Sequence, residues 1–222
     1  MSDPDAPDLD PGAVLWSAPP EQRAGRPLLV LLHGYGADEH DLYGLVPYLP
    51  EGFLVASVRA PLAPSWPAPG AAWYPIEDLS TRDAGAVTDA AESFLAWLDD
   101  AGHDGPVGLL GFSQGGAVSL QALRLQPERF AFAVVLAGYV APGELPRDAD
   151  LAELKPPVFW GRGARDEVIP ASLVAHTTEW LPGHVDLSGR VYAGLTHSVS
   201  QAELDDVATF LAKRLEPTTS SA

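Results

Sequence analysis

Cysteine is absent from the 222 residues of the chain. Its absence excludes a disulfide framework, a metal site built on thiolates and a cysteine nucleophile. It says nothing about the compartment, because chains without cysteine occur in every one of them.

Basic residues are scarce as well. The chain has 13 Lys and Arg against 30 Asp and Glu, a formal net charge of −17, and its only lysines are Lys155 and Lys213. Charged residues make up 19%, below the about 25% of an average domain, so the acidity reflects missing lysine more than abundant carboxylates. A negative field repels phosphate backbones and anionic membranes. The composition therefore argues against nucleic acid and stable membrane association, and it favours a small neutral substrate; a homodimer stays open.

Long apolar runs are also missing. The run at residues 28–32 is far shorter than the ~20 residues of a membrane-spanning helix. Residues 1–12 hold four Asp and three Pro, with no basic region and no apolar run, so they do not match a signal peptide. We therefore expect a cytoplasmic protein with a disordered acidic tail at 1–12, a single domain at 13–216 and a flexible tail at 217–222.

What the chain does contain is an alternation of short apolar runs with segments of helical period. The runs are continuously apolar, which is typical of strands buried on both faces of a parallel sheet. Ser200 and Glu203 form a capping box before the last helical segment. The order predicts an α/β fold with a mostly parallel, doubly wound sheet flanked by helices, and functional residues at the carboxyl ends of its strands. The predicted strands are 28–32, 53–58, 107–110, 132–136, 158–160 and 190–193, and the predicted helices are 87–98, 114–125, 170–180 and 201–215.

The strongest motif is a nucleophile elbow around Ser113. Gly111-Phe112-Ser113-Gln114-Gly115 directly follows the strand at 107–110 and directly precedes a helix, which is the context that the G-x-S-x-G motif requires. Side chains at 111 or 115 would collide with the neighbouring strand and helix, so both positions need glycine. We expect the turn to present the Ser113 hydroxyl outward, as a nucleophile.

A serine nucleophile needs a base, and in this fold the base is a histidine that follows the acid in the chain. Three histidines lie downstream of Ser113. His176 falls inside a predicted helix and His184 in a Pro-Gly loop that the pattern does not place, whereas His197 follows the last predicted strand. His197 is therefore the predicted base.

The predicted acid is Asp166, on the loop that follows the strand at 158–160. Its neighbour Glu167 is the fallback. Asp148 and Asp150 lie in an acidic stretch beside a proline and are expected to be solvated.

An oxyanion hole needs two backbone N–H groups near the nucleophile. One is the amide of Gln114, at the start of the helix after Ser113. The loop after the first predicted strand, His33-Gly34-Tyr35-Gly36, supplies the second, for which the Tyr35 amide is the best candidate, leaving the Tyr35 side chain to line the pocket. His33 is expected to hydrogen-bond loop backbone rather than take part in catalysis.

Together these motifs resemble the phospholipase/carboxylesterase family of α/β-hydrolases, which includes small bacterial carboxylesterases and acyl-protein thioesterases. The likeness runs from about residue 28 to residue 215. It implies Ser113, Asp166 and His197 as a triad, the amides of Tyr35 and Gln114 as the oxyanion hole, and no metal or cofactor. The family tends to have a Trp-Tyr pair, matched here by Trp73 and Tyr74. The chain departs from the family in having Pro75-Ile76 where relatives usually carry Asp, and Thr196 where glycine is common before the histidine, so the substrate stays open.

The longest irregular stretch, residues 59–82, bears on the substrate. It holds five prolines together with Trp66, Trp73 and Tyr74. These aromatic residues either form an apolar wall over an open substrate site or pack the loop onto the core, and the sequence favours neither. No insertion is large enough for a separate cap domain.

The expected protein is therefore a serine carboxylesterase that hydrolyses short to medium acyl esters through an acyl-enzyme. An acyl thioesterase or lysophospholipase with the same triad is one alternative. A non-catalytic binding protein on a hydrolase scaffold is the other.

Overall fold

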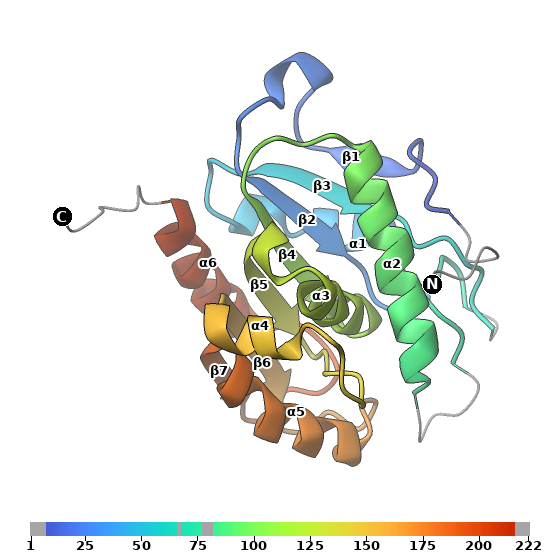
Figure 1. Cartoon of the computed structure of the whole chain (residues 1–222), viewed down its shortest axis with the longest axis vertical. Coiled ribbons are helices and arrows are strands. Elements are labelled where there is room, and N and C mark those ends of the chain that lie inside the picture. The colour runs from blue at the N-terminus through green and yellow to red at the C-terminus, as the bar shows by residue number, and fades with distance from the viewer. Residues whose placement is uncertain (1–7, 66–67, 77–81, 216–222) are drawn as a thin grey trace.

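One sheet organises the molecule (Figure 1). The structure is a computed structural model that describes residues 8–65, 68–76 and 82–215. In these ranges seven strands pair in the order β1-β3-β2-β4-β5-β6-β7, and every neighbouring pair is parallel except β1 with β3. The strands are β1 (Val14–Trp16), β2 (Leu28–Leu32), β3 (Leu54–Val58), β4 (Val107–Phe112), β5 (Phe130–Leu136), β6 (Pro157–Gly163) and β7 (Asp186–Tyr192).

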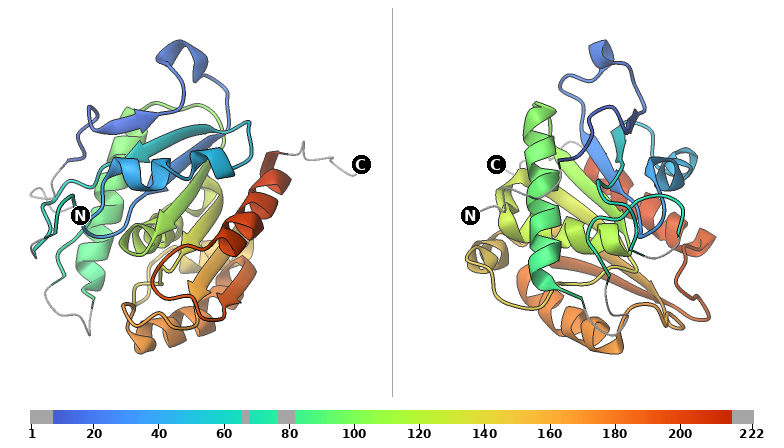
Figure 2. Two further views of the ribbon diagram at one scale, coloured as in Figure 1. Left: turned by 180° about the vertical axis from the view of Figure 1, so that it is seen from behind. Right: turned by 90° about the vertical axis from the view of Figure 1, so that its right-hand side faces the viewer.

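Helices cover both faces of this sheet, as Figures 1 and 2 show. Helices α2 to α5 lie on one face, and α1 and α6 lie on the other. The α-helices are α1 (Glu39–Tyr43), α2 (Ala84–Asp100), α3 (Gln114–Leu125), α4 (Asp148–Leu154), α5 (Ala171–His184) and α6 (Gln201–Leu215), with 3₁₀ turns at Pro20–Gln22, Val46–Tyr48 and Pro127–Arg129.

The continuous apolar runs are explained by this double cover. Every residue of β2 is fully buried. Leu28, Val30 and Leu32 belong to the core cluster under α2 and α3, whereas Leu29 and Leu31 belong to the cluster under α6. Since successive side chains of a strand point to opposite faces, a sheet covered on both faces needs an apolar residue at each position. The predicted doubly wound sheet is confirmed.

The predicted helix at 170–180 differs at its end. Helix α5 passes Pro182 and ends at His184, where the Val185 amide donates to the Leu181 carbonyl at 3.1 Å. A proline in the last turn removes only one helical hydrogen bond, and the chain leaves the helix within two residues. Proline so close to a helix end therefore did not stop the helix.

The sequence pattern did not predict the short helices and strands, nor the full length of the edge strand β7. Strand β1 and helices α1 and α4 have seven residues or fewer, too few to display a period. Strand β7 begins at Asp186 instead of residue 190, because its edge position leaves most of its side chains at least partly exposed and interrupts the apolar run.

The expected disordered tail at 1–12 is wrong for its last residues. Leu9 is 5% exposed and packs in the larger core cluster, and Asp10 accepts a hydrogen bond from the Gly12 amide at 2.8 Å. Burial of one leucine side chain fixes this segment on the domain. Residues 1–7 and the predicted tail at 217–222 lie outside the described residues.

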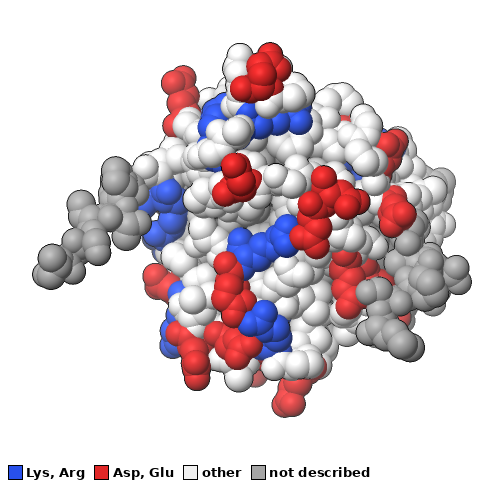
Figure 3. Space-filling view, turned by 45° about the horizontal axis from the view of Figure 1, so that its top comes forward, with Lys and Arg blue, Asp and Glu red and all other residues white. Residues whose placement is uncertain are grey.

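The acidic surplus does not gather at one point on the face shown in Figure 3, where basic side chains lie between the acidic ones. Among the described residues, no helix has both the length and the apolar character to cross a membrane.

The topology decides where a site can form. Strand β4 lies between β2 and β5, and β6 and β7 continue the sheet on one side. Because β2 to β7 are parallel, their carboxyl ends meet at one edge of the sheet. The loops that follow β2, β4, β6 and β7 therefore come together there.

Candidate active site

Ser113 lies on a strained turn between β4 and α3. Its backbone has φ 53° and ψ −113°, and its amide donates to the Leu136 carbonyl of β5 at 2.8 Å. A non-glycine residue with positive φ is uncommon and is held there only by its surroundings. A Cβ at Gly111 would lie 2.3 Å from the Gly115 carbonyl oxygen, and one at Gly115 would lie 2.0 Å from the Leu32 carbonyl oxygen. Both glycines are therefore required for the close packing of β2, β4 and α3, as predicted.

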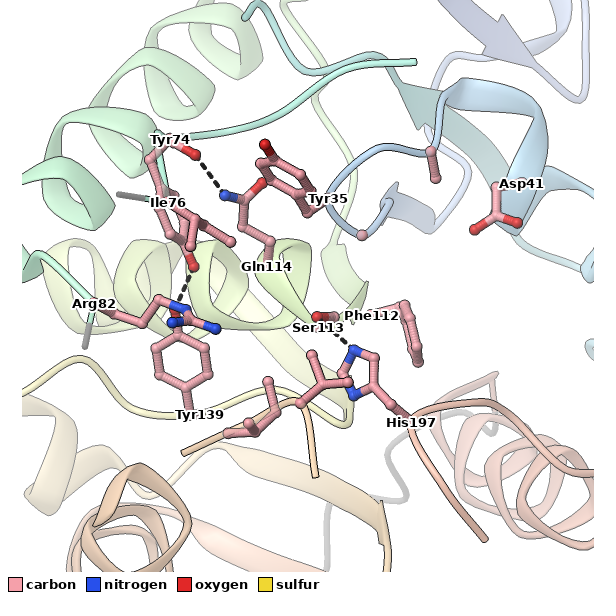
Figure 4. Close-up of a pocket in the computed structure, with 14 residues that line it drawn as sticks. Tyr35, Asp41, Tyr74, Ile76, Arg82, Phe112, Ser113, Gln114, Tyr139 and His197 are labelled. Atoms are coloured by element: carbon pink, nitrogen blue, oxygen red, sulfur yellow. Dashed lines mark hydrogen bonds between the residues drawn. The ribbon is translucent and has the colours of Figure 1, made fainter. Parts of the chain in front are cut away.

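The structure brings Ser113, His197 and Asp166 into one hydrogen-bonded line. His197 Nε2 lies 2.8 Å from Ser113 Oγ, a bond drawn in Figure 4, and His197 Nδ1 lies 2.7 Å from Asp166 Oδ2. Because the carboxylate can only accept, Nδ1 carries the proton and Nε2 is left to accept from the serine hydroxyl. This is the tautomer that a base for Ser113 needs.

Backbone amides hold the Asp166 carboxylate in place. Its Oδ1 accepts from the amides of Val168 at 2.9 Å and Ile169 at 3.2 Å, while Oδ2 faces the imidazole. The side chain is 5% exposed. Both oxygens are thus engaged, which fixes the direction in which the acid points.

The loops that carry the acid and the histidine are tied together. The Arg165 amide donates to the Leu195 carbonyl at 2.9 Å, and a Cβ at Gly163 would lie 2.1 Å from the same oxygen. On its other side the imidazole of His197 packs on the Phe112 ring, with 5.0 Å between ring centroids. The position of His197 is therefore set by β4, β6 and β7 together.

The other candidate histidines and acids have different surroundings. Glu167 is exposed beside Asp166. His176 lies inside α5, and His184 stacks on Trp180 at the end of that helix, with 3.6 Å between ring centroids. None of them has a hydrogen bond to Ser113 in the part of the chain that the structure describes.

The prediction that Asp148 and Asp150 are solvated holds for only one of them. Asp150 pairs with Arg147 at the surface. Asp148, however, binds Arg124, which is only 1% exposed, with 2.8 Å between Asp148 Oδ2 and Arg124 Nη2. A buried guanidinium needs an anion beside it, and the sequence pattern gave no sign that Arg124 would be buried.

The two predicted oxyanion donors both lie at the cavity beside Ser113. Gln114 is the first residue of α3, where backbone N–H groups point away from the helix without an intrahelical partner. Tyr35 lies in the loop after β2, in a turn closed by the Ala37 amide on the Gly34 carbonyl at 3.2 Å. Both residues line the same cavity as the serine.

His33 holds the start of this loop, as expected. Its Nδ1 donates to the Gly34 carbonyl at 2.8 Å and its Nε2 accepts from the Ala60 amide at 3.0 Å. Burial lowers the pKa of His33, which keeps the ring neutral for these two bonds.

The Gln114 side chain fixes part of the cavity wall. Its Oε1 accepts from the Trp73 amide at 2.8 Å, and its Nε2 donates to the Tyr74 carbonyl at 2.6 Å, the second bond being visible in Figure 4. One residue thus offers a backbone amide to the site and anchors the wall with its side chain.

The aromatic residues of the 59–82 stretch have different positions. Tyr74 lines the cavity. Trp73 does not line it: its ring is 2% exposed, and its Nε1 donates to the His33 carbonyl at 2.9 Å. Packing on the core is therefore the correct interpretation for Trp73, because the indole N–H found its partner inside. Trp66 lies outside the described residues.

The cavity encloses about 260 Å³ and includes residues that the sequence analysis missed. The Tyr74 and Tyr139 hydroxyls lie 2.5 Å apart, and burial raises the pKa of both phenols. Tyr139 lies three residues after the end of β5, so its position at the carboxyl end of a parallel strand is the sequence signal for it. The missed lining residues are Asp41, Ile76, Arg82, Phe112, Tyr139, Val168 and Ile169.

Within the described residues, one group has the spacing of metal ligands, namely Asp38, Glu39 and His40. Asp38 caps α1 through the His40 amide, and Glu39 Oε2 accepts from Arg59 Nη1 at 3.0 Å. These bonds account for the acids, and the group contributes no side chain to the cavity.

Comparison with known proteins identifies the family and the fold. Residues 18–215 match the family model Phospholipase/Carboxylesterase. Acyl-protein thioesterase 1 of Saccharomyces cerevisiae is 32% identical over 109 residues, which is 47% of this chain and 48% of the relative, so the match spans about half of that protein. Carboxylesterase SOBER1 of Arabidopsis thaliana is 27% identical over 164 residues, 67% of this chain and 70% of the relative. The solved structure of Zea mays acyl-protein thioesterase 2 superposes with a TM-score of 0.74 at 22% identity, covering 91% of this chain and 99% of that one, which confirms the fold.

Proposed function

The chain belongs to the phospholipase/carboxylesterase family, and on that premise we propose that it is a serine hydrolase that cleaves carboxylic esters through an acyl-enzyme. The observation that carries the proposal is the chain of hydrogen bonds from Asp166 through His197 to Ser113. Ser113 lines a cavity of about 260 Å³ that can hold a small ester.

Each step follows from the geometry. Ser113 Oγ attacks the carbonyl carbon while its proton passes to His197 Nε2. Asp166 stabilises the imidazolium that forms, and the amides of Gln114 and Tyr35 hold the negative oxygen of the tetrahedral intermediate. His197 then gives its proton to the leaving alcohol. Water releases the acyl group by the same route, which restores the Ser113 hydroxyl.

The size and lining of the cavity support short to medium acyl chains. At about 260 Å³ it is near the lower end of ligand pockets, which span about 300–1,000 Å³. Phe112, Val168 and Ile169 give it an apolar side. The α/β-hydrolase core has no separate cap domain in the part of the chain that the structure describes, so the cavity opens to solvent.

Replacing the nucleophile tests the proposal. Ser113→Ala should abolish hydrolysis of p-nitrophenyl butyrate and labelling by a fluorophosphonate, because no other hydroxyl meets His197 in the described structure. Ser119→Ala is the matched control: Ser119 lies on α3, the helix that follows Ser113, is also buried, and donates to the Gly115 carbonyl. A folded Ser113→Ala protein that still turns over the ester would overturn the assignment.

An acyl thioesterase is the second candidate, supported by the similarity to the Saccharomyces cerevisiae protein of that name. It uses the same residues, so only the substrate distinguishes it. Rates on a thioester and an oxyester of the same acyl chain separate the two. Hydrolysis of a lysophospholipid would instead identify a lysophospholipase. If a fluorophosphonate does not label Ser113, a non-catalytic binding protein is favoured.

The cytoplasm stays the proposed location. The net charge of −17 supports it, since such a surface disfavours adsorption to anionic membranes. Fractionation of cells that express the tagged chain is the test.

A further inference from the structure

The cavity beside Ser113 has a largely apolar lining, but it carries charged side chains on two sides. Figure 4 shows Arg82 beside Tyr139, on one side of Ser113, with Asp41 on the other side. All four residues line the cavity. The cavity is therefore polarised: it has a cation at one end, an anion at the other and the nucleophile between them.

Arg82 is close enough to act on both phenols. Its positive charge opposes the burial that raises the pKa of Tyr139 and of Tyr74. The two phenols are 1% exposed and bonded to each other. Since their pKa values are raised, both stay protonated at neutral pH; the bond between them uses one hydroxyl proton and leaves the other to donate.

A cation beside a phenol pair with one O–H left to donate is a poor lining for a hydrocarbon chain and a good one for a carboxylate. A guanidinium has five N–H donors in a planar fork, so it can bind a carboxylate while it keeps its bonds within the protein. Hydrogen bonds between charged groups are about twice as strong as neutral ones, and more so in an apolar surrounding. Asp41 would repel an anion at the other end, which gives such a substrate one orientation.

We propose that Arg82, with the hydroxyls of Tyr74 and Tyr139, binds a carboxylate carried by the ester substrate. The inference rests on the proposed ester hydrolysis and makes it more specific: the preferred esters bear a free carboxylate on the acyl or the alcohol part. It replaces, at the cavity, the neutral substrate expected from net charge. The charge of −17 acts at long range and slows anions, whereas Arg82 acts by contact.

Matched pairs of esters test the proposal. On the acyl side, mono-p-nitrophenyl glutarate is compared with p-nitrophenyl pentanoate. On the alcohol side, 4-carboxyphenyl butanoate is compared with phenyl butanoate. The measured quantity is the ratio of kcat/KM within each pair, for the native chain, for Arg82→Gln and for Arg190→Gln.

Arg190→Gln is the control for net charge. Arg190 lies on the edge strand β7, half exposed, 3.7 Å from Asp206 and outside the cavity. It removes the same charge as Arg82→Gln and should leave both ratios unchanged. Arg82→Lys, which keeps the charge and loses the fork, should retain part of the preference.

The expected result is a preference of about tenfold or more for the carboxylate ester in one pair, lost in Arg82→Gln. The pair that responds tells which part of the ester faces Arg82. Equal rates within both pairs, or a preference that survives Arg82→Gln, would overturn the proposal while leaving ester hydrolysis intact. If no ester is cleaved and Ser113 is not labelled, the proposed function itself fails.

Discussion

Two acids with buried side chains, Asp166 and Glu203, have opposite surroundings. Asp166 accepts from two backbone amides and from the His197 imidazole. Glu203, in the first turn of α6, is 1% exposed, and neither of its oxygens has a hydrogen-bond partner in the described structure. Its Oε1 is packed so closely on β6 that a Cβ at Gly161 would lie 2.2 Å away. The Asp166 carboxylate is thus buried with hydrogen-bond partners, and the Glu203 carboxylate is buried without them.

The difference appears in the ionisation of Glu203. Burial raises its pKa to about 7, with the charge of Asp206 adding to the effect and the nearby Ser200 amide opposing it. An ionised carboxylate without partners is costly inside a protein, and protonation removes that cost. Asp166 thus contributes an oriented charge to the site, whereas Glu203 contributes a penalty that depends on pH.

The largest effect should come from replacing Asp166, the acid whose oxygens all have hydrogen-bond partners. Asp166→Asn keeps an oxygen for the Val168 and Ile169 amides and lets His197 take the wrong tautomer, so kcat/KM on p-nitrophenyl butyrate should fall roughly 10⁴-fold. Thermal unfolding and circular dichroism check that the variant is folded. A loss below tenfold in a folded variant would mean that Asp166 does not orient the base.

Replacing Glu203, the acid without hydrogen-bond partners, by a neutral residue should stabilise the protein. The native Glu203 holds its proton to about pH 7, and the unfolded side chain loses it near pH 4.5. The free energy of unfolding should therefore fall between these values as pH rises, by up to about 3 kcal/mol from this group. Glu203→Gln should remove the fall, so that it is more stable than the native chain at pH 8 and equal to it at pH 4.5.

Urea unfolding at both pH values measures this, and the difference between the two proteins cancels all other titrating groups. Equal stability of the two proteins at pH 8 would show that Glu203 is not penalised when ionised. Activity is expected to change little, because Glu203 does not line the cavity.

The smallest effect is expected for an acid on the exposed side of the same helix. Asp205 is exposed, and its carboxylate accepts from the Gln201 side chain at 2.9 Å. Asp205→Asn should change the free energy of unfolding by less than about 0.5 kcal/mol at either pH. If this variant matched Glu203→Gln, the gain would come from net charge and not from burial.

The sequence could place Asp166 but not explain Glu203. Ser113, Asp166 and His197 each follow a strand, and a parallel sheet brings such positions to one edge. Glu203 was predicted to complete a capping box with Ser200. Half of that prediction holds, since the Glu203 amide donates to Ser200 Oγ at 3.2 Å. Whether the carboxylate turns to solvent depends on what packs over it, and the strand that does so, β6, ends at Gly163, far from Glu203 in the sequence.

For the same reason, the local sequence pattern could not predict which residues line the cavity. Trp73 and Tyr74 are neighbours of similar character, yet one is buried in the core and the other lines the cavity. Their positions are decided by the Gln114 side chain, which comes from another part of the chain. Arg82 lies in an irregular stretch, where no periodicity indicates which way a side chain points.

The position of β7 at the edge of the sheet has a consequence for how the protein loses activity. The elbow of Ser113 ends β4, which is enclosed by β2 and β5, but His197 is carried by β7, which pairs only with β6 and is largely exposed. Local opening of such an edge costs less than unfolding of the whole sheet. Mild heat or denaturant should therefore separate the base from the nucleophile while most of the fold persists, so that inactivation precedes unfolding.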